Sequence, residues 1–236
     1  MLLKVTDSQA ADVRAARTRS KVFAVANFFG AMFSKVVPWG CGPRFLPAYT
    51  LKHEGGTGYL QAEPYLEDPR CKLSHEVPED PSEHIVSETY KFAAFQFFVY
   101  KLSDKSIVFP SCTLAGHFWS DISVASVSGQ VGGQLDQNDV GKKAWQDSFP
   151  KIYGPLLGLA PETLLENDSD TFLRLMRDKG LLKVSGEKTK LSYSSGQVDR
   201  KPQRGLTWPP AARRAALGLS HPGGVVVEQK KILDVF

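Results

Sequence analysis

The most chemically suggestive stretch of the sequence is TLAGHFWSD, residues 113–121, in which a small glycine turn delivers an aspartate just after an apolar run. Asp121 lies in apolar sequence, flanked by Trp119 and Ile122. A semi-buried carboxylate needs a cation, a metal ion or hydrogen-bond donors. Asp121 is therefore a candidate Mg²⁺ ligand or catalytic aspartate. The competing interpretation is a helix cap or a surface turn, and the local pattern alone favours it.

Other patterns that carry chemistry are missing from the sequence. The glycine runs 55–58 and 129–133 lack the Lys and Ser or Thr that close a phosphate-binding P-loop. No G-x-S-x-G turn is present, and the five histidines never occur in HxH or HxxxH spacing. The three cysteines are widely spaced, which argues against a disulfide framework or a cysteine-built zinc site. A reducing, intracellular or cytoplasmic location is expected.

The elements that would position Asp121 follow from apolar periodicity. A 3.6-residue period predicts an amphipathic helix over residues 8–33, and a dense aromatic run predicts a buried helix over 87–101. Two extended runs, 45–51 and 59–66, lie on either side of a glycine-rich turn and predict a hairpin. Pro110 indicates an edge or a bulge in the strand predicted over 106–114. Helices are predicted over 8–33, 87–101 and 142–153, and a helical hairpin or two short helices over 161–182. Strands are predicted over 45–51, 59–66 and 106–114.

Composition divides the chain of 236 residues into two regions. Residues 181–236 hold ten Lys or Arg against four Asp or Glu, whereas the rest of the chain is close to neutral. We predict a folded domain over 1–182 and a basic, disordered tail over 183–236. No run reaches about 18 apolar residues, so no membrane partner is expected. The excess of basic residues lies in the predicted tail rather than on predicted structure, so no nucleic-acid partner is expected either.

Taken in order, these segments resemble the atypical alpha-kinase family of serine/threonine protein kinases. The matching pieces are ADVRAARTRSKVFAVANFF, YLQAEPYLED, AAFQFFVYKLS, IVFPSCTLAG, WSDISV, NDVGKKAWQDSF and LLGL, spread over roughly residues 8–160. The resemblance implies an α+β, two-lobed kinase-like fold with an antiparallel sheet and packed helices. The N-lobe is expected to be reduced, because only Met1–Lys4 stand where the family has further strands.

The resemblance also implies ATP-dependent phosphoryl transfer to a protein substrate, with ATP and Mg²⁺ as cofactors. By this likeness Asp121 would bind the metal and serve catalysis, and Lys4 would contact phosphate. Glu63 and Tyr65 would belong to the strand that holds the adenine.

Departures from the family pattern affect both metal sites. Thr113 and Ala115 stand where the family's D-L-Q-G motif carries its acid and its metal-binding Gln. Losing one well-placed electrostatic group typically costs on the order of 10²–10³ in rate. The family's four zinc ligands fall near Phe97, Ile152, Gly154 and Gly158. An apolar repacking without zinc is therefore expected.

Two functions of different classes follow from these residues. The first is an alpha-type protein kinase. The alternative is a catalytically inactive pseudokinase that binds a nucleotide, or a protein partner through the basic tail or the loop 129–141. A globular α+β protein with coincidental motifs is the third possibility.

Overall fold

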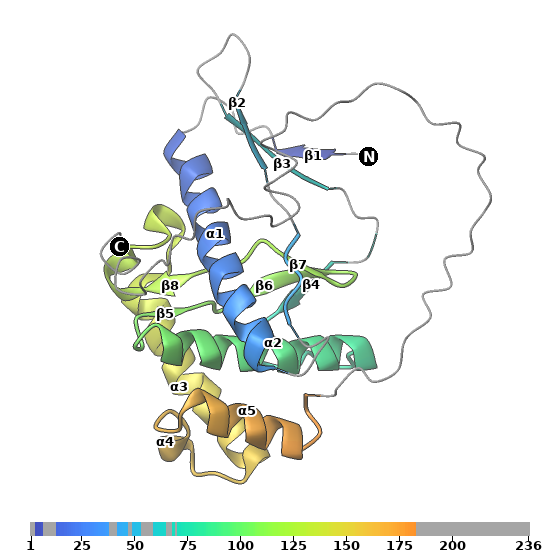
Figure 1. The fold of residues 1–236 in the computed structure, drawn as a ribbon, viewed down its shortest axis with the longest axis vertical. Helices are drawn as coiled ribbons and strands as arrows, with labels where there is room; N and C mark the ends of the chain where they lie inside the picture. The colour runs from blue at the N-terminus through green and yellow to red at the C-terminus, as the bar shows by residue number, and fades with distance from the viewer. Residues whose placement is uncertain are drawn as a thin grey trace, which may run out of the picture. The chain divides into compact units, whose positions relative to one another are not determined.

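A computed structural model describes residues 3–6, 13–37, 42–46, 49–52, 59–64, 68 and 70–182 (Figure 1). These residues form a mixed helical and antiparallel β-structure, so the predicted α+β class is confirmed. Tyr65 and the predicted tail over 183–236 lie outside the described residues. No helix in the described ranges is both long enough and apolar enough to cross a membrane.

The described helices lie close to the predicted ones, with shifted ends. The first begins and ends later than predicted, and the third starts four residues earlier. The helices are α1 (Val13–Val36), α2 (Glu83–Leu102), α3 (Asn138–Leu157), α4 (Pro161–Leu164) and α5 (Ser169–Asp178). Asp168 caps α5, because its side chain accepts a 2.7 Å hydrogen bond from the Thr171 amide.

The described strands form three antiparallel sheets, with strand orders β1–β3–β2, β4–β6–β7 and β5–β8. The predicted hairpin is confirmed, since β2 pairs with β3 and Thr50 lies opposite Gln61. The strands are β1 (Leu3–Thr6), β2 (Tyr49–Lys52), β3 (Tyr59–Pro64), β4 (Arg70–Leu73), β5 (Ile107–Val108), β6 (Cys112–Ala115), β7 (Phe118–Ser120) and β8 (Ala125–Ser126).

The single strand predicted over 106–114 is wrong. The chain breaks into β5 and β6, which belong to different sheets. Pro110 lies at the break and has no N–H for a ladder. The side-chain amide of Gln96 fills the gap by donating to the carbonyls of Phe109 (2.7 Å) and Pro110 (3.0 Å).

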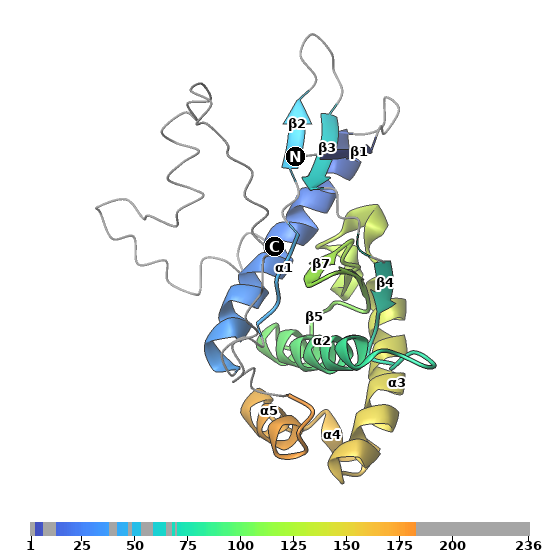
Figure 2. The same ribbon diagram turned by 90° about the vertical axis from the view of Figure 1, so that its right-hand side faces the viewer.

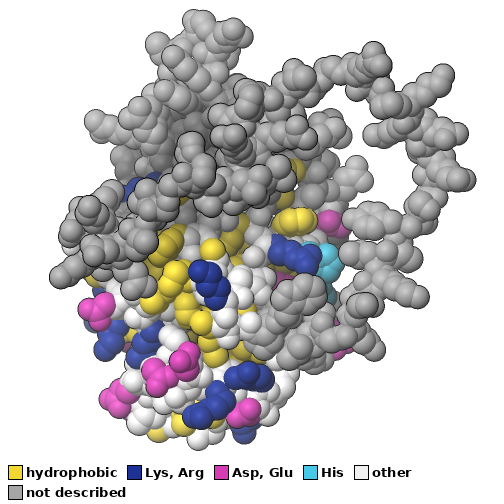
Figure 3. All heavy atoms as spheres, viewed as in Figure 1, with side chains coloured by type: hydrophobic (Ala, Val, Ile, Leu, Met, Phe, Trp, Pro, Cys, Tyr) yellow, Lys and Arg dark blue, Asp and Glu magenta, His cyan; other side chains and the backbone are white. Residues whose placement is uncertain are grey.

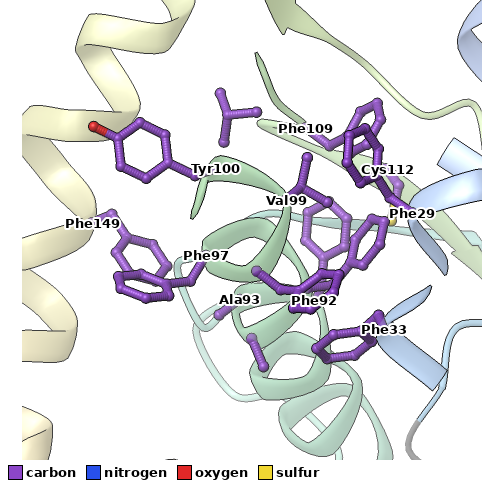
Figure 4. Packing of buried hydrophobic residues seen from close by; sticks show 14 of the residues in the cluster. Phe29, Phe33, Phe92, Ala93, Phe97, Val99, Tyr100, Phe109, Cys112 and Phe149 are labelled. Carbon is purple, nitrogen blue, oxygen red and sulfur yellow. The ribbon is translucent and has the colours of Figure 1, made fainter. Parts of the chain in front are cut away.

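Helix α2 is the centre of the core, and Figure 2 shows it lying between α1 and α3. Every residue from Phe92 to Tyr100 is buried. Its aromatic rings reach in three directions, toward Phe33 of α1, Trp119 of β7 and Phe172 of α5. Figure 4 shows part of this packing, including Phe97 of α2 beside Phe149 of α3. A helix buried on all sides explains why this segment lacks a polar stripe.

Candidate functional site

The sheet β4–β6–β7 places the residues that precede Asp121. Its inner face is apolar, because Leu73, Cys112, Leu114 and Trp119 are all buried in the core. The alternation of a strand sends the residues between them to the opposite side. We call that side the outer face, and it carries Arg70, Lys72, Thr113, Ala115, Phe118 and Ser120.

The register of the sheet sets cations opposite the two altered motif positions. Arg70 lies opposite Ala115, and Lys72 lies opposite Thr113. Directly opposed residues of an antiparallel pair share one face, with Cβ atoms about 5 Å apart. Lys72 is exposed and the Arg70 side chain is 29% exposed, whereas Ala115 is fully buried. Two basic side chains therefore flank the positions at which the family resemblance expects an acid and an amide.

Asp121 follows β7 in a bend with a φ of 45°. Aspartate tolerates this left-handed conformation better than most residues because its short polar side chain bonds locally. Its side chain is 57% exposed, and Oδ2 lies 3.5 Å from Nη1 of Arg70. The assumption of a semi-buried carboxylate is wrong. Asp121 lies in a surface turn, and the cation beside it is an arginine.

Of the magnesium ligands that the resemblance implies, the sequence keeps Asp121 and has Thr113 and Ala115 in place of the acid and the amide. Protein-bound Mg²⁺ needs oxygen ligands, typically one or two carboxylates together with phosphate oxygens. Asp121 is already ion-paired with Arg70. Within the described ranges, no three His, Cys, Asp or Glu side chains gather where they could hold a metal ion.

Lys4 and Glu63 come together on a different sheet. They are directly opposed Cα partners in the pairing of β1 with β3. The sheet that carries them and the sheet that precedes Asp121 share no strand among the described residues. The backbone positions of Lys4 and Glu63, two of the predicted binding residues, are therefore neighbours across β1 and β3. Asp121 pairs with Arg70 instead.

An aromatic cluster occupies the region where the family resemblance would put zinc ligands. Phe97 is fully buried and stacks on Phe172 with ring centroids 4.0 Å apart, and the Phe149 ring packs against both, at 6.0 Å from Phe97 and 5.9 Å from Phe172. Gly154 is also buried, and a Cβ there would approach the Cα of Pro161 to 3.0 Å. Phe97 therefore packs among aromatic rings, and the Lys101 ammonium lies over its ring, 5.6 Å from the centroid.

The glycine-rich loop before α3 is organised by a buried carboxylate that the sequence did not single out. Asp136 accepts hydrogen bonds from the amides of Ser126 (2.7 Å), Gly132 (3.0 Å) and Asn138 (2.8 Å), and from the Ser126 hydroxyl. These backbone N–H groups are the kind that elsewhere cradle a phosphate. Here an internal anion already takes them, so the loop has a structural explanation.

His75 is a second buried polar residue that sequence patterns did not indicate. Its Nε2 lies 2.8 Å from the Ser148 hydroxyl, and its backbone carbonyl accepts a 3.0 Å bond from Tyr153. Burial lowers the pKa of the His75 imidazole, and the neighbouring Glu76 carboxylate offsets only part of that effect. The ring is therefore held neutral near pH 7 and ties the segment after β4 to α3.

The buried cysteine Cys112 does not provide a nucleophile. Cys112 is buried, and burial followed by the charges of Glu88 and Asp121 raises the pKa of its thiol well above the usual value. A thiol held protonated is a poor nucleophile. Cys112 packs in the inner face of the sheet as an apolar side chain.

Charged side chains of both signs are interspersed over the described surface in Figure 3, with apolar side chains between them. This pattern differs from the single-sign stripe that tracks a nucleic-acid backbone. On the visible face, the described region offers no continuous basic track.

Comparison with known proteins gives fold-level similarity only. No family model matches the chain, and no curated protein matches it. Among solved structures, the alpha-kinase domain of myosin heavy chain kinase A in complex with ADP is 18% identical with a TM-score of 0.49. The match covers 62% of this chain and 58% of the length of that domain. The alpha-kinase domain of myosin-II heavy chain kinase A in complex with adenosine is 18% identical, with a TM-score of 0.48. The match covers 62% of this chain and 56% of that domain.

The chain therefore spans less than two thirds of the length of these solved domains. At this identity and TM-score, the similarity establishes neither membership of a family nor an activity. The function has to be argued from this chain's own residues.

Proposed function

We propose that this chain is a kinase-like domain that binds a nucleotide and has lost phosphoryl transfer, that is, a pseudokinase. The observation that carries the proposal is the ion pair between Asp121 and Arg70. Asp121 follows the hairpin of β6 and β7, in which Thr113 and Ala115 occupy the positions of the family's acid and amide. Phosphoryl transfer depends on metal ions and fixed charges around the transferred group. This arrangement lacks the acid and the amide that would hold such an ion.

Nucleotide binding is supported separately by β1 and β3. The resemblance assigns Lys4 to phosphate and Glu63 to the adenine strand, and these two residues are opposed Cα partners. Adenine recognition by such a strand uses mainly backbone groups, so it does not depend on the altered residues of β6. Binding can therefore persist where catalysis does not.

An active protein kinase is the second candidate, and the exposure of Asp121 favours it. A carboxylate that is 57% exposed can reach a metal ion or a substrate hydroxyl if Arg70 is displaced. Under this alternative, Mg²⁺-ATP would label the protein itself or a basic test protein. Asp121→Ala would abolish the label.

The two candidates are separated by one pair of measurements on the full chain. Thermal unfolding is followed with ATP, ADP and adenosine, with and without Mg²⁺, and transfer of the ATP γ-phosphate is measured in parallel. We expect ATP at a hundred times its Kd to raise Tm by about 5–10 °C, with no transfer above background. Transfer that depends on Asp121 would establish the kinase. No shift with any nucleotide would refute nucleotide binding and favour a protein-partner module.

A further inference from the structure

We propose that His84 and His117 form a binding site for one divalent transition-metal ion of the zinc, copper and nickel class. The site lies where the turn between β6 and β7 meets the first turn of α2. Its evidence is the spacing of two exposed imidazoles, a hydrogen bond that fixes one tautomer, and a neighbouring carboxylate. None of these observations depends on nucleotide binding, so the inference is separate from the proposed function.

The spacing of the two rings is the first step. The ring centroids of His84 and His117 lie 4.9 Å apart, and the ring planes are inclined at 71°. A metal ion lies about 2 Å from an imidazole nitrogen, so two rings on one tetrahedral ion have centroids about 5 Å apart. Both residues are exposed, and Figure 3 shows histidine side chains on the described surface. The pair is therefore spaced as two ligands of one ion, and water can complete the coordination.

The tautomer of His84 is the second step. Its Nε2 lies 2.9 Å from the carbonyl oxygen of Gly116. A carbonyl oxygen can only accept, so Nε2 carries the hydrogen, and the lone pair of the neutral ring is on Nδ1. Metal-binding histidines commonly donate their second ring N–H to a backbone carbonyl in this way. Nδ1 of His84 is then the nitrogen that can bind a metal ion, and the bond to Gly116 orients the ring.

The carboxylate of Asp68 is the third step. A Cβ built on Gly116 would lie 2.5 Å from Oδ2 of Asp68, so this carboxylate lies against the residue that precedes His117. A negative charge there attracts a cation and can accept hydrogen bonds from metal-bound water. In the described ranges no three His, Cys, Asp or Glu side chains form a metal cluster, so Asp68 acts from outside the coordination shell.

The chemistry of the two ligands selects the class of ion. Imidazole nitrogens bind Zn²⁺, Cu²⁺ and Ni²⁺, whereas Mg²⁺ and Ca²⁺ prefer oxygen ligands. A bound ion would join α2 to the β6–β7 hairpin, whose second strand ends one residue before Asp121. The competing explanation is an ordinary edge-to-face contact between two surface rings, which predicts no metal affinity above background.

The test is calorimetric titration of the full chain with NiCl₂ and with ZnCl₂ at pH 7.5. We expect the wild type to bind one more ion than the double variant His84→Gln/His117→Gln. Each single variant should weaken this site tenfold or more, because loss of an outer-shell partner alone costs about 10–100-fold. Asp68→Asn should weaken it less. Binding should also weaken at pH 5.5, because both imidazoles must be unprotonated to bind the ion.

His221→Gln is the matched control, because it removes a histidine from the segment 183–236 and should leave the site intact. Urea midpoints of the variants in EDTA should equal the wild-type midpoint, which separates loss of the site from loss of the fold. Equal numbers of bound ions in the wild type and the double variant would overturn the inference. Loss of binding in only one of the two single variants, or displacement of Ni²⁺ by an equal concentration of Mg²⁺, would overturn it as well.

Discussion

The indole nitrogen of Trp119 donates a 3.0 Å hydrogen bond to Oε2 of Glu88, which joins β7 to α2 inside the core. Oε1 of the same carboxylate accepts a 2.7 Å bond from Lys91, one turn further along the helix. Glu88 is 8% exposed and Trp119 is 1% exposed. A carboxylate this buried is tolerated only when its charge and lone pairs are satisfied. The network therefore fixes the strand that ends one residue before Asp121.

Removing the carboxylate should destabilise the whole domain. We expect Glu88→Ala to lower the free energy of unfolding by about 3 kcal/mol, because Lys91 and the Trp119 indole both lose their partner. Glu88→Gln should lose less, since its amide oxygen can still accept from Trp119. Urea denaturation followed by circular dichroism measures both. Glu79→Ala, at an exposed position, should stay within about 0.5 kcal/mol of the wild type. Equal losses in Glu79→Ala and Glu88→Ala would contradict the role of the network.

The network also shows where prediction from sequence ends. The helix over 87–101 and the hairpin of β2 and β3 were predictable, because their apolar periods are local. The partner of Glu88 lies 31 residues away, and no periodicity encodes that pairing. The break at Pro110 was indicated by the residue type, but the choice of a different partner strand for each half depends on tertiary packing.

Asp136 should hold the loop between β8 and α3. Asp136→Ala would leave three backbone N–H groups without their acceptor, and each buried unsatisfied group costs about 1–3 kcal/mol. We expect a loss of about 3 kcal/mol in unfolding free energy together with faster proteolytic cleavage within residues 127–137. Asp139→Ala is the control, because Asp139 is exposed and makes only a long 3.4 Å contact with the Ser128 amide and a pair with Lys142. If cleavage rates of the two variants matched, Asp136 would not be what orders the loop.

The candidate site was only partly predictable for the same reason. The order of motifs led to Thr113, Ala115 and Asp121, because each lies in a short local pattern. Arg70 was not indicated, since its relation to these residues is a cross-strand register and an ion pair. The exposure of Asp121 was also missed, because apolar neighbours in sequence alternate between the two faces of a strand.

Phe97 should be one of the most costly positions in the core. Its ring is fully buried and stacks on Phe172 at 4.0 Å, so Phe97→Ala would leave a large cavity between α2 and α5. We expect a loss of about 3–5 kcal/mol in unfolding free energy. Phe28→Ala removes the same atoms at a position that is 42% exposed, and should cost much less. Similar midpoints for the two variants in urea would show that the aromatic cluster is not tightly packed.

His75 should make stability fall in mildly acidic solution. Burial lowers the pKa of its imidazole in the folded state below the usual value of 6.5. The unfolded chain then binds the proton first as the pH drops, so the contribution is intact above about pH 6.5 and is lost as the pH falls toward the folded pKa. The slope from one such group is at most about 1.4 kcal/mol per pH unit.

We expect this slope between pH 6.5 and 5.5 to be smaller in His75→Gln, whose amide can still bond to the Ser148 hydroxyl but cannot take up a proton. Urea denaturation at pH 7.5, 6.5 and 5.5 measures the slope for each protein. The control is His117→Gln, at an exposed ring, which should keep the wild-type slope. The Glu76 carboxylate lies 3.9 Å from Nε2 and favours the protonated ring, so Glu76→Gln should steepen the decline. A His75→Gln profile that overlays the wild type would place the acid sensitivity elsewhere in the chain.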